Sequence, residues 1–117
     1  MADWSIEFYV LENDESPIAA WYDAQNSKVQ AKLLHVFELL EELGIEVGMP
    51  HVKPLGDKLY EIRIRVDRHN FRVIYFAYTD RRFILLHGFQ KKTQKTPSKD
   101  LEMARKYLED FLERSSD

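Results

Sequence analysis

The side chains best suited to chemistry in this sequence are the lysines and arginines gathered in residues 51–95. This segment holds eleven Lys or Arg and four Asp or Glu, a local charge of +7, in a chain whose formal net charge is −3. Residues 1–50 carry a charge of −8 and residues 96–117 a charge of −2. Because a mildly acidic protein has concentrated its positive charge in one segment, we expect that segment to bind a polyanion.

Two of these arginines alternate with apolar residues. Arg63 and Arg65 alternate with Ile62 and Ile64, so in a strand the arginines share the face opposite the isoleucines. A guanidinium is always charged, and its planar donors suit a phosphate. The same pattern also fits a solvated sheet face with cross-strand ion pairs, in which Glu61 supplies a partner. Both interpretations stay open on residue type alone.

Arg72 and two lysines extend the cationic set. Arg72 opens an apolar run and therefore needs an anion, from either a structural salt bridge or a ligand. Lys91 and Lys92 belong to the polar segment 90–95, which is either a solvated loop or a cationic rim beside the arginines. A lysine there could contact phosphate or, if neighbouring positive charge lowered its pKa, accept a proton.

Two further residues have competing interpretations. His87 lies in an apolar run, where a histidine is more often a hydrogen-bonded structural residue than a catalyst. Tyr75 could stack on a base if it were exposed, but aromatic residues in strands are usually part of the core.

The composition argues against several classes of protein. With no cysteine there is no disulfide, thiol nucleophile or thiolate metal site. The four histidines lack metal-ligand spacing, so we predict no metal and no cofactor. Four glycines leave no phosphate-binding loop. We expect no signal peptide and no membrane span, since no apolar run approaches the ~20 residues a span needs. These features favour a cytoplasmic protein.

Periodicity in the sequence predicts the strands and helices that carry the cationic side chains. At 117 residues the chain is expected to form one domain, 1–117. Alternation predicts strands, and spacing of three and four predicts helices with Ser16 as the first N-cap and Gly44 as a stop. The predicted strands are 4–10, 60–66, 71–78 and 83–89, and the predicted helices are 16–26, 29–43 and one from 98 onward. Residues 44–58, rich in Gly and Pro, are predicted to be a loop.

This order predicts an α+β fold. We expect a twisted antiparallel sheet made of the N-terminal strand and a C-terminal three-strand meander, with an N-terminal helical hairpin and a C-terminal helix. The helices are expected to pack on one face of the sheet, leaving the arginine face open.

Three segments and the helix after them are more specific together than any one alone. They are YEIR at 60–63, FRVIY at 71–75 and LHGFQKKTQKTP at 86–97. In this order they resemble the RelE/ParE toxin superfamily and, within it, the phage-derived, HigB-like branch. The likeness covers nearly the whole chain. It implies a RelE-like fold and a type II toxin–antitoxin toxin.

The resemblance implies a metal-independent, ribosome-dependent endoribonuclease, an mRNA interferase that inhibits translation. In such a reaction an RNA 2′-hydroxyl attacks the neighbouring phosphate. A basic group takes the proton, cations stabilise the phosphorane and an acid protonates the leaving oxygen. The composition agrees with this, because without metal or thiol the charge must be stabilised by arginine and lysine, and the internal nucleophile exists only on RNA.

The resemblance also assigns roles to residues. Arg63 matches a strand arginine that clamps the scissile phosphate, and Arg72 one that supports the transition state or acts as acid. Lys91 and Lys92 match lysines that contact phosphate or act as base. Less specific candidates are Glu61 as base or positioning group and, for RNA binding, Arg65, Tyr75, His87 and Lys95. Unlike some relatives, this chain has no histidine or tyrosine in its last ten residues.

Two alternatives remain within this interpretation. The first is a ParE-like gyrase inhibitor, which binds a protein and cleaves nothing; the second is a non-catalytic interaction module. A cationic cluster on one face favours cleavage, whereas dispersed arginines, or arginines paired with internal carboxylates, favour a binder. The implied partners are mRNA, the ribosome and a cognate antitoxin with a helix-turn-helix domain, HigA-like. The toxin alone is expected to be a monomer.

Overall fold

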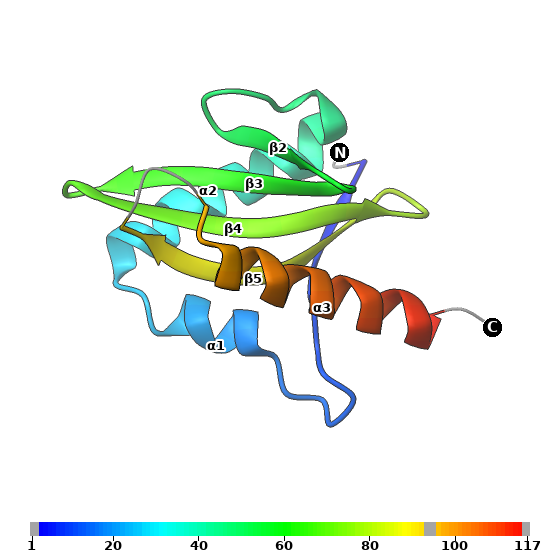
Figure 1. Ribbon diagram of the computed structural model, residues 1–117. Coiled ribbons are helices and arrows are strands. Elements are labelled where there is room, and N and C mark those ends of the chain that lie inside the picture. The colour runs from blue at the N-terminus through cyan, green and yellow to red at the C-terminus, as the bar shows by residue number, and fades with distance from the viewer. Residues whose placement is uncertain (1–2, 93–95, 116–117) are drawn as a thin grey trace.

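The computed structural model describes residues 3–92 and 96–115, which form an α+β fold around one five-stranded mixed sheet (Figure 1). The elements, in chain order, are β1 (Ser5–Phe8), α1 (Pro17–Asp23), α2 (Ser27–Leu43), a 3-10 turn η1 (Gly44–Glu46), β2 (Val52–Gly56), β3 (Leu59–Val66), β4 (His69–Tyr78), β5 (Arg82–Lys91) and α3 (Ser98–Ser115). The strands follow the order β1-β5-β4-β3-β2 across the sheet. The predicted helical hairpin, meander and C-terminal helix are confirmed.

The helix boundaries follow from their capping residues. Ser16 accepts a hydrogen bond from the Ala19 N–H at 3.2 Å, and proline occupies the first turn of α1. The first helix ends at Asp23, earlier than predicted, because the Asn26 side chain accepts from the Val29 N–H at 3.0 Å and caps α2 instead. Gly44 ends α2 with a φ of 62°, as predicted for a glycine stop.

No helix in the described ranges is long and apolar enough to cross a membrane.

The N-terminal strand pairs differently from the prediction. β1 runs parallel to β5, with Ser5 opposite Arg82 and Phe8 opposite Leu85, so the sheet is mixed and not wholly antiparallel. The alternation of residues 4–10 shows which side chains share a face, but it does not show the direction of the neighbouring strand. The helical hairpin carries the chain from β1 at one edge of the sheet to β2 at the other.

The segment predicted as a loop contains a strand. β2 pairs with β3 from Val52 opposite Ile62 to Gly56 opposite Leu59, with a bulge between Pro54 and Gly56. A proline cannot donate to a central ladder, but it is tolerated on an edge strand or at a bulge. β2 is such an edge, so the proline and glycines that indicated a loop are compatible with a short strand.

Helices cover both faces of the sheet, whereas the sequence predicted helices on one face. Consecutive strand residues point to opposite faces. In β5, Gly88 faces the ring of Trp21 from α1, while the neighbouring His87 is hydrogen-bonded to Asp100 of α3. Figure 1 accordingly shows α3 in front of the sheet and α2 behind it. α3 covers only part of its face, and the cationic residues lie beyond it.

Gly88 provides a test of this packing. A Cβ at this position would come within 2.3 Å of the Trp21 ring, so a Gly88→Ala variant should lose about 1–3 kcal/mol of unfolding free energy. Urea unfolding followed by tryptophan fluorescence measures the loss. Gly48→Ala is the matched control, because a Cβ there meets nothing within 4 Å. Equal stability of the two variants would contradict the close packing of α1 on β5.

Candidate functional site

The register of β3, β4 and β5 brings the predicted cations together on one face of the sheet. Arg63 lies directly opposite Arg72, and Arg65 lies opposite Asn70. On the other side of β4, Asn70 lies opposite Lys91. Like charges directly opposite each other on neighbouring strands are destabilising. A pair of facing arginines is therefore hard to explain by stability and is typical of a site that binds an anion.

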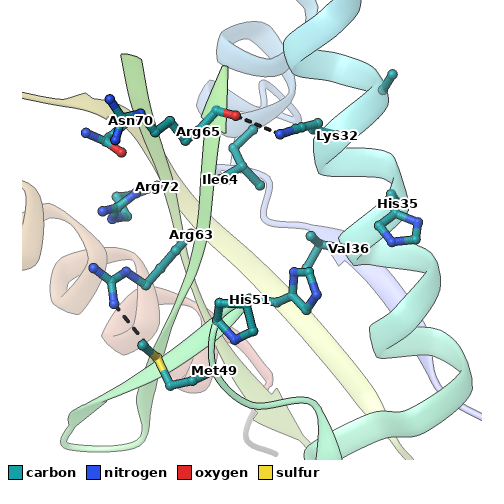
Figure 2. Close-up of a pocket in the computed structure, with 12 residues that line it drawn as sticks. Lys32, His35, Val36, Met49, His51, Arg63, Ile64, Arg65, Asn70 and Arg72 are labelled. Carbon is teal, nitrogen blue, oxygen red and sulfur yellow. Dashed lines mark hydrogen bonds between the residues drawn. The ribbon is translucent and has the colours of Figure 1, made fainter. Parts of the chain in front are cut away.

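All of these residues except Arg65 border a cavity of about 780 Å³. We call it the cationic cavity; its lining consists of Arg63, Arg68, His69, Asn70, Arg72, Gln90, Lys91 and Lys92. Five of these eight residues are lysines or arginines and none is acidic. Figure 2 shows Arg63 and Arg72 on the side of β3 turned away from α2, while Ile64 points toward that helix. The cavity can hold a phosphate with several cations around it.

Arg72 forms the floor of the cluster and is incompletely paired. The residue is 5% exposed, and its Nη1 donates to the Phe71 carbonyl at 3.0 Å. Its Nε lies 3.5 Å from Glu61 Oε1, close enough for attraction, yet this buried nitrogen has no hydrogen-bond partner in the described structure. Burial lowers the pKa of Arg72, the Glu61 charge opposes that shift and Arg63 adds to it. An anion entering the cavity would offset this unfavourable burial.

Glu61 supports the cluster from beneath and does not line the cavity. It is 1% exposed and accepts a hydrogen bond from the Thr96 hydroxyl at 2.8 Å. It also forms an ion pair with Arg72. From the sequence, Glu61 was a candidate base or positioning group. The place of Glu61 in the fold corresponds to positioning of Arg72.

Lys91 and Lys92 follow one another at the end of β5. Lys91 is half-buried and Lys92 is exposed. Burial lowers the pKa of Lys91 from its usual 10.5, and the charge of Arg72 lowers it next. Glu61 opposes the shift, while Arg63 and Lys53 add to it. Lys91 thus lies within the electrostatic reach of both arginines, as expected of a group that could give up its proton.

The remaining candidates have other positions. Arg65 is exposed on the cationic face, next to the cluster. The ring of His87 is hydrogen-bonded to Asp100 at 2.7 Å and stacks on Phe89, and it does not line the cavity. Tyr75 is 2% exposed and stacks on Tyr60 on the opposite face, so we leave it out of the proposed site. Lys95 lies outside the described residues.

Sequence reasoning missed Arg68, His69, Asn70 and Gln90, which complete the lining. The first three lie in the turn between the predicted strands 60–66 and 71–78, and no pattern in the sequence indicated that they belong to the site. That turn is a two-residue hairpin loop, Asp67-Arg68, with φ values of 48° and 70°, and Val66 and His69 pair on either side of it. Such a loop fixes the register of the two strands. Recognising it would have placed Arg63 opposite Arg72 and Asn70 beside them.

Among the described residues, no group of three His, Asp or Glu side chains could hold a metal ion.

Most of the chain matches a known protein family. Residues 20–109 match the family described as phage-derived protein Gp49-like (DUF891). No curated protein matches the sequence. Because the match covers more than half of its length, the chain belongs to the Gp49-like family of phage-derived proteins, a family associated with RelE-like toxins.

Proposed function

We propose that this protein is the toxin of a type II toxin–antitoxin system, of the HigB-like kind, and that it cleaves mRNA on the ribosome without a metal. The observation that carries the proposal is the convergence of Arg63, Arg72 and Lys91 on one open cavity. Membership of the Gp49-like family supports the toxin part of the proposal.

Each cation of the cavity can take a separate role in the reaction. Arg63 and Arg72 donate hydrogen bonds to the non-bridging oxygens of the scissile phosphate, whose charge grows in the transition state. Neutral Lys91 takes the proton from the attacking 2′-hydroxyl. The new bond joins O2′ to phosphorus, and the bond to the 5′-oxygen breaks. That oxygen receives a proton from a cation of the cavity, Arg72 or Lys92, leaving a 2′,3′-cyclic phosphate and a 5′-hydroxyl.

The testing experiment uses purified protein with ribosomes carrying a reporter mRNA. Primer extension maps new 5′ ends, and parallel reactions omit the ribosomes. We expect cuts on the ribosome that disappear when the cut nucleotide carries a 2′-deoxy sugar, because the internal nucleophile is then absent. Intact mRNA under all conditions would contradict the proposal.

A ParE-like gyrase inhibitor is the second candidate. The ion pair between Arg72 and Glu61 favours it, since one cation of the cluster is partly paired inside the protein. Inhibition of DNA supercoiling by purified gyrase, together with intact mRNA, would support this alternative. In either case we propose an antitoxin with a helix-turn-helix domain as the partner, whose acidic surface would cover the cationic cavity.

The lowered pKa of Lys91 gives the proposed nuclease a pH dependence. Only the neutral amine accepts a proton, so the single-turnover rate should rise about tenfold per pH unit and level off below pH 10.5. A Lys91→Ala variant should be slower and lack this rise. Lys58→Ala, which changes an exposed lysine in the β2–β3 turn, should keep it. A rise that persists in Lys91→Ala would exclude Lys91 as the base.

A further inference from the structure

A second cavity lies between α2 and β3, where β2 no longer covers the edge of the sheet. Pairing of β2 with β3 stops at Val52 opposite Ile62. Beyond that point, the Arg63 N–H donates to the His51 carbonyl at 2.8 Å, and the Arg65 carbonyl accepts from Lys32 Nζ at 2.8 Å. Arg63, His51, Lys32 and Arg65 line a cavity of about 570 Å³ here, which we call the β3 groove (Figure 2).

The β3 groove differs in chemistry from the cationic cavity. Its interior is apolar, formed by the buried Val36 and Ile64, and the exposed Met49 lies at its edge. Two imidazoles, His35 and His51, stand beside these residues with ring centroids 6.3 Å apart and planes at 76°. Flat apolar and imidazole surfaces suit the face of a nucleobase. The volume also lies within the range of small-molecule sites.

The two cavities share part of their lining. Arg63, Asn70 and Arg72 border both. The Arg63 Nη1 lies 3.8 Å from the Met49 sulfur, at the boundary between the two. One nucleotide can therefore place its phosphate in the cationic cavity and extend its base toward the β3 groove.

The charges around the β3 groove indicate an anionic occupant. Its rim carries Lys32, Arg63 and Arg65, and no acidic residue lines it in the described part of the chain. An acidic peptide would satisfy this rim as well. A peptide lying in the groove would leave the adjoining cationic cavity unfilled, however, whereas a nucleotide places its base in the apolar interior and its phosphate in that cavity.

We infer that the β3 groove is a nucleobase subsite, which binds the base next to the phosphate held in the cationic cavity. This inference rests on the proposed function and adds to it the site where RNA bases are discriminated. The bases that fit the groove would determine which positions of an mRNA are cut.

The inference is tested by blocking the β3 groove. Ala31 is an exposed α2 residue that lines the groove, so Ala31→Trp should fill it. Leu34→Trp is the matched control, because Leu34 is 50% exposed on the same helix and lines neither cavity. Fluorescence anisotropy measures binding of a short RNA made non-cleavable by 2′-O-methyl groups, and of the same RNA with one abasic position at a time.

We expect one abasic position to weaken binding to the wild type about tenfold, the typical effect of losing one stacked base. Ala31→Trp should weaken binding of the intact RNA by a similar factor and leave binding of that abasic RNA at the wild-type level, whereas Leu34→Trp should bind both RNAs as the wild type does. Equal binding of intact RNA by the two variants would overturn the inference while the proposed nuclease stands. Binding of polyglutamate is measured in the same way. If Ala31→Trp weakened binding of polyglutamate but not of RNA, the β3 groove would be a peptide site and the inference would be overturned. Failure of the wild type to bind any of the free RNAs would overturn the inference, whereas the proposed function itself would fall only if mRNA on the ribosome also stayed intact.

Discussion

Replacing Arg63 by alanine should slow RNA cleavage by about 10²- to 10³-fold and leave the fold intact. The expected loss is that of one preorganised donor to the charge that develops in the transition state. The fold should tolerate the change because Arg63 has no carboxylate within ion-pair distance among the described residues. Removing it also relieves repulsion with Arg72, so the melting temperature should stay the same or rise slightly. Single-turnover cleavage and thermal unfolding measure the two effects.

Arg81→Ala serves as the control for this experiment. Arg81 is exposed in the β4–β5 turn, far from the cationic face, and pairs loosely with Asp3 at 3.8 Å. The Arg81→Ala change removes the same charge from the protein as Arg63→Ala does. Comparing the two variants therefore separates a local effect from a general loss of electrostatic attraction for RNA. If both variants lost activity equally, the cationic cavity would have no special role. Full activity in Arg63→Ala would remove Arg63 from the mechanism.

A second large effect is expected from Glu61, this time on stability. Glu61→Ala leaves the buried Arg72 guanidinium without its counter-charge and the Thr96 hydroxyl without its acceptor. Breaking one side of a buried ion pair typically costs about 3–5 kcal/mol. The loss should appear in urea unfolding as a lower midpoint.

The double variant Glu61→Gln with Arg72→Met isolates the cause. It removes both charges while keeping an acceptor for Thr96, so most of the stability should return. Cleavage should remain lost, because Arg72 is absent. The single variant Glu61→Gln addresses the sequence-based alternative that Glu61 is the general base. A complete loss of cleavage without any loss of stability in that variant would favour the base role over positioning of Arg72.

The sequence was informative wherever side chains alternate. The facing of Arg63 and Arg65 away from Ile62 follows from the two-residue period of a strand, and the structure confirms it. The need of Arg72 for an anion was also predicted from its apolar neighbours, and Glu61 now supplies part of it. What alternation could not give was register. The facing of Arg63 and Arg72 depends on the Asp67-Arg68 loop, whose residues differ from the Asn-Gly and Asp-Gly pairs typical of such turns.

Other features depend on contacts that lie far apart in the chain. Tyr75 had an exposed and a buried interpretation, and the choice depended on α1 and α2 covering its face of the sheet. The parallel partner of β1 was missed because it lies far along the chain, whereas the strand in residues 52–56 was missed because its proline and glycine indicated a loop. The β3 groove is likewise invisible in the sequence, since it results from β2 ending before β3 does.

The parallel pairing of Ser5 with Arg82 also bears on how the protein is made. A growing polypeptide would expose β1 early, yet its neighbour in the sheet emerges only after most of the chain has been synthesised. Contacts between such distant segments form late in folding, because a large loop must close first. Prematurely terminated chains that stop before β5 would leave β1 unpaired and would also lack Lys91. Under the proposed function, products that stop before β5 should therefore be inactive.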